Sequence, residues 1–323
     1  MKSLGTRIRK LEWLWKNVGV VGVLCIVGAV VGIFQILTGG AFLSYEGVRS
    51  LIFNMSYFLI AACGLTFVIM MGSFDFSVVS VVKLSALLCV LYLDRIGLLI
   101  IPIAIGISTG FGLINGLFVA VLNIPSFMAT LGVSVVVEGI ALYLSKGHLH
   151  LVYNETFRAL AMTSIGGLPS IFYWAIVVWV LSIVLAAYTP FGRRTYAIGL
   201  NIVAAKLSGV NVAMQRVVVF MVSGLYAGLA GVLYMAQLGG GSMLIGSDLA
   251  VPLFASVVAG GTALTGGVGG PHRTILGVII ITWTQAGMAM LALGRDIQML
   301  VFGAVAIVLS IATINRRRLR ISK

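Results

Sequence analysis

The sequence predicts an all-α fold, a polytopic transmembrane helical bundle of about ten spans. Of its 323 residues, 60% are hydrophobic and only 9% are charged, and the mean hydropathy is +1.15. Soluble domains contain about 25% charged residues, so this chain has too few to cover a water-exposed surface. Its apolar runs reach the roughly 20 residues that a helix needs to cross a bilayer core of about 30 Å. These observations exclude a soluble enzyme, a disordered chain and a coiled coil.

Ten apolar runs are separated by polar, Gly-rich or Pro-containing segments. Each run is expected to be a helix, because lipid cannot satisfy backbone polar groups. The predicted spans are residues 18–37, 51–71, 77–93, 97–121, 126–144, 170–189, 217–238, 249–264, 274–293 and 297–314. The eighth run is short for a span, and a re-entrant segment is an alternative there. We interpret the first run as a retained span, because it has no clear small-residue site for cleavage of a signal peptide.

The basic residues predict the orientation. The chain has 21 Lys and Arg against 8 Asp and Glu, a formal net charge of +13. With ten spans both termini share one side, and that side carries 15 Lys and Arg against 5 in the opposite loops. Cytoplasmic loops carry such an excess, so both termini are predicted to be cytoplasmic and to contact membrane lipid. Nucleic-acid binding is not expected, since no aromatic stacking surface accompanies the charge.

This orientation divides the chain into three parts. Residues 1–17 form a basic cytoplasmic N-terminus, residues 18–314 form the transmembrane domain, and residues 315–323 form a basic cytoplasmic tail. The transmembrane domain is predicted to include one long basic cytoplasmic loop, 191–216, and a polar loop on the opposite side, 145–169.

The sequence contains no group of residues typical of catalysis. Cys25, Cys63 and Cys89 lie inside apolar runs without short spacing, which indicates core residues and not disulfides or metal ligands. His148 and His150 have no Cys or acidic neighbours, so a metal site is not predicted. The phosphate-binding motif G-x-x-x-x-G-K-[ST] and the hydrolase motifs G-x-S-x-G and H-E-x-x-H do not occur. We predict a protein that is not an enzyme; if it uses ATP, another subunit must bind the nucleotide.

Two Gly-rich interruptions break the apolar pattern, at 71–77 and at 258–270. Broken helices in matching halves of a transporter are typical of a transport path. The alternative is a pair of ordinary loops.

Segment 191–216 contains a predicted short helix over residues 202–208. Asn201 precedes it as an N-cap, and Gly209 follows it as a stop. Small side chains at Ala204, Ala205 and Ser208 lie near one face, and such a helix can fit into a groove on a partner. A loop on the membrane surface is the alternative interpretation.

Several short motifs occur in a fixed order along the chain. In segment 191–216 they are Phe191-Gly192-Arg193, Tyr196–Gly199, Asn201, Ala204-Ala205 and Ser208–Asn211. Further motifs are Gly112–Gly116, Ile124–Gly132 and Gly260–Gly267. In kind and order these motifs resemble those of the ribose-type (monosaccharide) permeases of ABC importers, within the branched-chain-type permease superfamily. The resemblance extends from about residue 50 to the end of the chain.

The resemblance implies a permease subunit of an ATP-binding-cassette importer in the bacterial inner (plasma) membrane. It implies three kinds of partner: cytoplasmic subunits that bind ATP and Mg, an extracytoplasmic solute-binding protein, and a second permease copy or homologue. Because the partner subunits bind ATP and Mg, this chain is expected to need no cofactor. The solute is expected to be a sugar or a similar small polar molecule, moved by alternating access. Coupling to the ATPase is expected in loop 191–216, at Gly199, Asn201, Ala204, Ala205, Ser208 and Gly209.

The chain departs from the family pattern in several places. The family usually has Gly-Gly-x-Asp-Leu-Ser-Val-Gly-Ser where this chain has Gly72–Ser80, and Phe76 replaces the Leu. Lys83 and Glu138 are also unusual for the family. Charges inside spans are costly unless they pair or face water, so we predict either a pair between helices or two residues on a polar path. Candidates for the solute path are Asp75, Asn115, Ser126, Thr130 and Glu138.

Other functions are open at this point. An ion-coupled secondary transporter would need intramembrane carboxylates, for which Asp75 and Glu138 are candidates. Within the ABC family, the solute could instead be a nucleoside or another non-sugar molecule. An intramembrane enzyme lacks a catalytic group of residues in this sequence.

Overall fold

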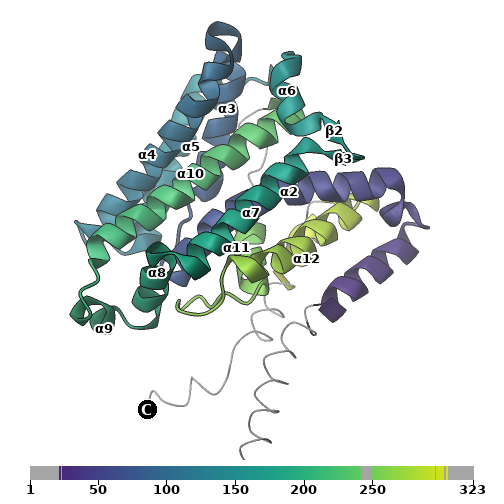
Figure 1. Ribbon diagram of the computed structural model, residues 1–323. Helices are drawn as coiled ribbons and strands as arrows, with labels where there is room; N and C mark the ends of the chain where they lie inside the picture. The colour runs from purple at the N-terminus through teal and green to yellow at the C-terminus, as the bar shows by residue number, and fades with distance from the viewer. Residues whose placement is uncertain (1–21, 23, 242–248, 295, 302, 305–323) are drawn as a thin grey trace, which may run out of the picture.

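The computed structural model describes residues 22, 24–241, 249–294, 296–301 and 303–304. The predicted tails and most of the predicted span 297–314 lie outside these residues. Helices form nearly all of the described chain (Figure 1). They are Leu24–Leu37, η1 Ala41–Leu43, α2 Tyr45–Met70, α3 Val78–Ile96, η2 Gly97–Leu99, α4 Ile100–Ala120, α5 Ser126–Ser145, α6 Glu155–Met162, α7 Ser170–Tyr188, α8 Pro190–Leu200, α9 Ile202–Leu207, α10 Val212–Leu238, α11 Ala250–Ala259 and α12 Pro271–Met290. Residues 296–301 and 303–304 are also helical.

Two short antiparallel strand pairs complete the described fold. β1 His150–Leu151 pairs with β4 Gly240–Gly241, and β2 Ser164–Ile165 pairs with β3 Leu168–Pro169. The β2–β3 strand pair and α6 lie at one end of the bundle, and α8 and α9 lie at the other (Figure 1).

Six stretches of the described chain are long and apolar enough to cross a membrane. One of them, Val78–Ala120, contains the two helices α3 and α4, which pack against each other. Two shorter apolar helices, Leu24–Leu37 and α11, accompany them. The prediction of an all-helical membrane bundle is confirmed.

Three helices begin before the apolar runs that predicted them. α2 begins at Tyr45 and not at residue 51, α10 at Val212 and not at 217, and α12 at Pro271 and not at 274. A hydropathy pattern identifies only the apolar part of a helix, whereas local capping fixes its start. The Ser44 hydroxyl accepts from the Gly47 N–H at 3.1 Å, and Pro271 occupies the first turn, where its missing N–H costs nothing.

Two predicted loops contain helices. Segment 191–216 contains the predicted short helix as α9 and, in addition, most of α8 and the start of α10. The polar stretch 145–169 contains α6, which begins where the Asn154 side chain accepts from the Phe157 N–H at 2.9 Å. Phe157 and Ala161 are fully buried, so α6 is amphipathic and covers one end of the bundle.

The predicted eighth span, 249–264, is helical only over α11. Its ten residues give about 15 Å at 1.5 Å per residue, which is half of a bilayer core. The chain turns after Ala259, and residues 260–270 form an irregular loop before α12. The helix is therefore too short to cross a bilayer.

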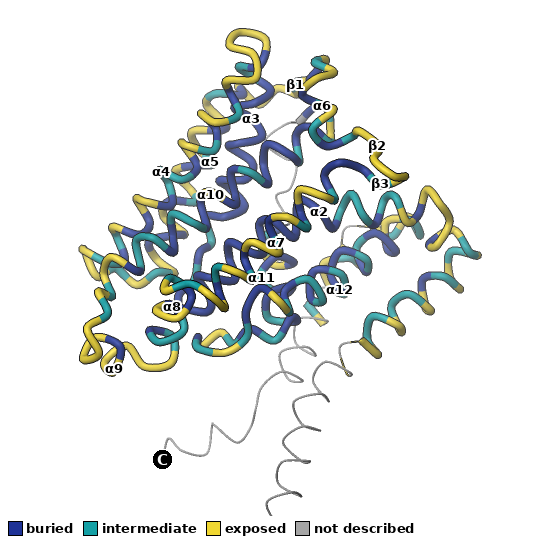
Figure 2. The backbone as a smooth tube through the Cα atoms, in the orientation of Figure 1, coloured by how far each residue is buried: buried dark blue, intermediate teal, exposed yellow. Residues whose placement is uncertain are grey.

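α10 lies at the centre of the bundle and packs against α2, α3 and α4. Figure 2 shows buried residues along the faces where these helices meet and exposed residues on the outer faces. Glycines allow α4 and α10 to come into backbone contact: a Cβ at Gly112 would overlap the Phe220 carbonyl, and one at Gly224 would overlap the Ser108 carbonyl. Small residues are the usual means by which membrane helices approach closely.

This packing makes a testable prediction. Gly112→Ala forces a methyl group into the α10 backbone, and overpacking of this kind costs about 1–3 kcal/mol. We expect a lower thermal midpoint of the purified protein in detergent, followed by fluorescence-detected size exclusion. Gly106→Ala, on the same helix, is the matched control, because nothing lies within 4 Å of its Cβ position. Equal midpoints for the two variants would contradict the close approach.

Candidate functional site

The α8–α9 segment is built from local caps. Asn201 ends α8 and begins α9, since its side-chain oxygen accepts from the N–H groups of Val203 and Ala204, both at 3.0 Å. α9 ends at Leu207, and Gly209 follows with φ 81°, the left-handed conformation that favours glycine. The predicted cap, short helix and stop are therefore all present.

α9 presents most of its surface outward. Its residues are exposed except Ala205, which is 4% exposed and faces the protein. Ala204 and Ser208 remain exposed, so the small residues predicted to share one face are divided between an inner and an outer side. The outer side carries two large apolar side chains one turn apart: Val203 is 64% exposed and Leu207 is 85% exposed.

The end of α8 meets the two Gly-rich interruptions at a junction of backbones. The Gly267 N–H donates to the Met70 carbonyl at 2.8 Å, which joins the 260–270 loop to the end of α2. A Cβ at Gly199 would overlap the Met70 carbonyl and lie 2.5 Å from the Gly267 nitrogen. A Cβ at Gly266 would lie 2.6 Å from the Gly72 nitrogen. We call these five residues the glycine junction: Met70, Gly72, Gly199, Gly266 and Gly267.

Side chains attach α8 to its neighbours around this junction. The Tyr196 hydroxyl donates to the Gly269 carbonyl at 2.6 Å. Burial raises the pKa of the Tyr196 phenol, although the nearby Arg273 lowers it in part, so the hydroxyl stays protonated and donates at neutral pH. On α10, the Gln215 amide donates to the Phe191 carbonyl at 3.0 Å and to the Thr195 hydroxyl at 2.9 Å. α8 is therefore fixed to both the loop and α10.

The interruption at 71–77 extends along the first turns of α5. The Phe74 N–H donates to the Ser126 hydroxyl at 3.0 Å, and the Phe76 N–H donates to the Thr130 hydroxyl at 3.1 Å. The two predicted path residues on α5 thus satisfy backbone groups of the broken segment.

Asp75 points the other way, into the protein. Its carboxylate accepts from the Ser77 N–H at 3.1 Å, the Ser77 hydroxyl at 2.6 Å and the Ser223 hydroxyl at 2.8 Å. The Asn115 amide donates to the Ser77 hydroxyl at 2.7 Å. Asp75 is 2% exposed and Asn115 is 0% exposed. In this conformation the two residues hold the break in place and do not line an open path.

Four phenylalanines lie on the opposite side of the break from Asp75. The Phe76 ring stacks on Phe254 of α11 at 4.5 Å between centroids and meets Phe127 of α5 edge-on at 5.3 Å. The ring centroids of Phe74 and Phe254 are 6.4 Å apart. Such pairs stabilise each other by about 0.5–1.5 kcal/mol beyond their burial. This aromatic cluster joins the break to α5 and α11, and apart from the unusual Phe76 it could not be predicted from the sequence.

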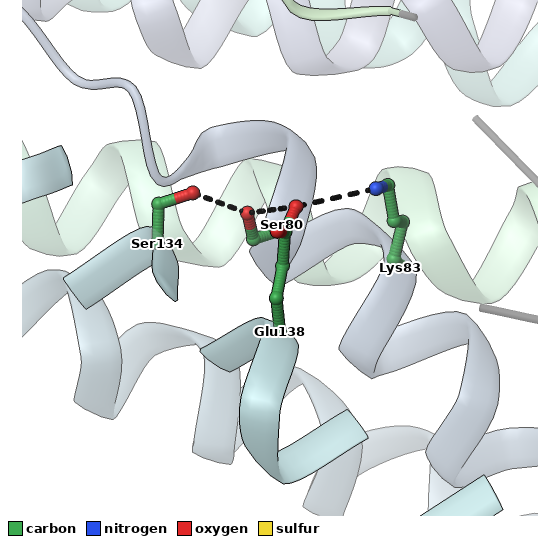
Figure 3. Close-up of polar contacts among 4 residues, drawn as sticks. All are labelled: Ser80, Lys83, Ser134 and Glu138. Atoms are coloured by element: carbon green, nitrogen blue, oxygen red, sulfur yellow. Dashed lines mark hydrogen bonds and ion pairs between the residues drawn. The ribbon is translucent and has the colours of Figure 1, made fainter. Parts of the chain in front are cut away.

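Lys83 of α3 and Glu138 of α5 form the predicted ion pair, with Nζ and Oε1 3.3 Å apart. Ser80 and Ser134 extend it into a polar group: their hydroxyls are 2.6 Å apart, and Ser80 donates to Glu138 Oε1 at 3.3 Å (Figure 3). The two partners differ in exposure, because the Lys83 side chain is 8% exposed and that of Glu138 is 46% exposed. The pair is therefore buried on one side only, and Glu138 faces outward from α5.

The five residues predicted to line the solute path do not all lie together in the structure. Asp75 and Asn115 share one network, and Ser126 and Thr130 bind the same break, but Glu138 belongs to a separate polar group. Ser223 was missed, because a serine within an apolar run has no distinctive pattern. Within the described part of the chain, no three His, Cys, Asp or Glu side chains could hold a metal ion.

The sequence of residues 47–310 matches the family described as the branched-chain amino acid transport system / permease component. The chain belongs to this family. Members similar to it include three bacterial proteins. The probable ABC transporter permease protein YphD of Escherichia coli is 29% identical over 96% of this chain and 94% of its own length. The ribose import permease protein RbsC of Haemophilus influenzae is 31% identical over 84% of this chain and 86% of its own length.

The L-arabinose transport system permease protein AraH of Escherichia coli is 28% identical over 90% of this chain and 88% of its own length. These relatives confirm the resemblance to sugar permeases of ABC importers within this branched-chain permease family. No solved structure matches the chain.

The one-sided burial of the ion pair makes a second prediction. Glu138→Gln leaves the Lys83 ammonium buried without a counter-charge, and an unsatisfied buried group costs about 1–3 kcal/mol. We expect a lower thermal midpoint for this variant than for the parent protein. The double variant Lys83→Met/Glu138→Gln should recover most of the loss, because it removes both charges. Additive losses in this double-mutant cycle would show that the two side chains are not coupled.

Proposed function

We propose that this chain is the permease subunit of an ATP-binding-cassette importer that moves a sugar or a similar small polar solute by alternating access. Similarity along nearly the whole chain to ribose and L-arabinose permeases supports this function. The capped, exposed helix α9 supports it independently, since a permease without a nucleotide site needs a surface through which an ATPase can act on it.

The protein is proposed to lie in the bacterial inner membrane with ten crossings and both termini in the cytoplasm. The bias of Lys and Arg supports this orientation. α11 is proposed to take part in one of these crossings, although it is too short to cross alone. In support, β4 before it pairs with β1 near α6 at one end of the bundle (Figure 2), and the 260–270 loop after it bonds to α8 at the other. The permease domain then spans residues 18–314, between the two basic tails.

ATP and Mg are proposed to be bound by separate cytoplasmic subunits, so that this chain carries no cofactor. The docking element is α9, with Val203 and Leu207 as the apolar contacts and Ala204 and Ser208 allowing close approach. Asn201 and Gly209 fix the ends of the helix, and Ala205 anchors it to the protein. A solute-binding protein is proposed to dock at the opposite end, and a second permease to pack beside this one.

The glycine junction is proposed to carry motion from α9 into the membrane. α8 is a short rigid helix fixed at Gly199 to the end of α2 and to the 260–270 loop. With no side chains between the backbones, a shift of α8 moves both interruptions together. Nucleotide binding on the partner can shift this equilibrium only by binding one arrangement more tightly than the other.

The solute path is proposed to open where the broken segment 71–77 separates from α5 and α11. The aromatic cluster closes this contact, and the hydroxyls of Ser126 and Thr130 become available when the Phe74 and Phe76 N–H groups leave them. Hydroxyl and amide groups form weak, transient hydrogen bonds with a polar solute. Asp75 and Asn115 hold the far side of the break, and Glu138 offers a carboxylate on the outer face of α5.

Reconstitution tests the proposed function directly. The permease, combined in proteoliposomes with its proposed ATP-binding subunit and solute-binding protein, should accumulate radiolabelled ribose or L-arabinose only when ATP is present. Binding-protein screening against nucleosides would identify a non-sugar solute. Uptake by the permease alone on a proton or sodium gradient would overturn the proposal in favour of a secondary transporter.

A substitution on α9 tests the docking surface. Leu207→Glu should weaken ATPase association at least about tenfold, because central apolar contacts dominate interface affinity, while the amount of protein in the membrane stays unchanged. Leu149→Glu is the matched control: this leucine is also exposed, at 63%, but precedes β1 at the other end of the bundle. Co-purification of the ATPase measures both variants, and full retention by Leu207→Glu would argue against α9 as the contact.

A further inference from the structure

A cavity of about 550 Å³ opens where α7 ends, α8 begins and α12 starts. Its wall includes Tyr196, which also bonds to the 260–270 loop, but none of the proposed path or docking residues. Its wall includes Ile183, Ala186, Ala187, Arg193, Tyr196 and His272. One side of the cavity is thus apolar and the other carries cationic and hydrogen-bonding groups.

Two hydrogen bonds fix the elements that form this cavity. The Trp179 indole of α7 donates to the Pro271 carbonyl at the start of α12, at 2.8 Å. The Tyr196 hydroxyl of α8 donates to the Gly269 carbonyl just before α12, at 2.6 Å. The cavity is therefore preformed and does not depend on a loop closing over it.

The charge around the cavity is of one sign. Arg193 and His272 line it, and Arg194 and Arg273 are their neighbours in the chain. The segments that form this end of the bundle, 189–216 and 258–273, contain no Asp or Glu. An anion that enters the cavity meets no repelling carboxylate from these segments.

The apolar side of the cavity continues along α7. Val180 and Val184 are 45% and 42% exposed and lie on the same face of the helix as the exposed Ala187 in the cavity wall, at i, i+4 and i+7. This strip leads from the cavity toward the middle of the span. A ligand with an anionic head and a long apolar tail fits both parts.

We propose that this cavity binds the headgroup of an anionic phospholipid, with the phosphate between Arg193 and His272 and an acyl chain along Val180 and Val184. Basic pockets between membrane helices on the cytoplasmic side bind such headgroups. The lipid holds the ends of α7, α8 and α12 together. The site rests on the proposed cytoplasmic placement of this end of the bundle, but lipid binding can be measured without transport.

The test uses the full-length protein, purified in detergent and stripped of lipid. Phosphatidylglycerol should raise its thermal midpoint and remain bound in native mass spectrometry, whereas phosphatidylcholine should do neither. Inorganic phosphate at the same concentration should not replace the lipid, because it has no acyl chain. A phosphate shift equal to that of the lipid would overturn the lipid assignment.

Variants locate the site. Arg193→Gln/His272→Gln should weaken phosphatidylglycerol binding about tenfold, since it removes the guanidinium charge of Arg193 and the hydrogen-bonding imidazole of His272 from the cavity wall. Lys146→Gln is the matched control, because Lys146 lines a cavity of similar size, about 580 Å³, near the end of α5. Both altered residues of the double variant are exposed, and its midpoint without lipid checks that it folds. Unchanged binding by the folded double variant, or an equal loss in Lys146→Gln, would refute the proposal.

Discussion

The arrangement of this protein depends on one constraint, the contact of three backbones at the glycine junction. The end of α2, the end of α8 and the loop before α12 meet with no side chain between them, and the hydrogen bond from Gly267 to Met70 joins two of these segments directly. Inside or near a membrane, backbone groups that leave a helix must find partners within the protein. The junction provides such a partner and brings together the two segments that interrupt the apolar pattern.

The break after α2 is stabilised by partners on both of its sides. The Asp75 carboxylate accepts from Ser77 and Ser223, whereas the Phe76 ring packs against Phe127 of α5 and Phe254 of α11. The backbone N–H groups bind hydroxyls of α5. One short segment is therefore held by a polar network on its inner side and by aromatic contacts on its outer side. Such an element can separate from α5 and α11 while it remains attached to α10.

Much of this architecture could be predicted, because a bilayer imposes a fixed length of apolar helix. The spans at 126–144 and 170–189 agree with α5 and α7 to within one residue at each end. The short helix after Asn201 was predictable from capping chemistry, which is local. The starts of α2, α10 and α12 were missed, because polar first turns carry no hydropathy signal. α6 within 145–169, and α8 and the start of α10 within 191–216, were hidden in the same way by polar residues.

The sequence by itself determined the class of protein, the helical character of its spans and the likeness to sugar permeases, and it placed Lys83 and Glu138 within apolar runs without deciding whether they pair. Only the tertiary structure decided which residues meet. It brings Asp75 to Ser223, 148 positions apart, joins the two Gly-rich interruptions, and turns Ala205 inward while Leu207 faces out. The physical reason is that helix rotation and close backbone approach depend on the packing of all neighbours at once, whereas composition, capping and span length are properties of a single segment.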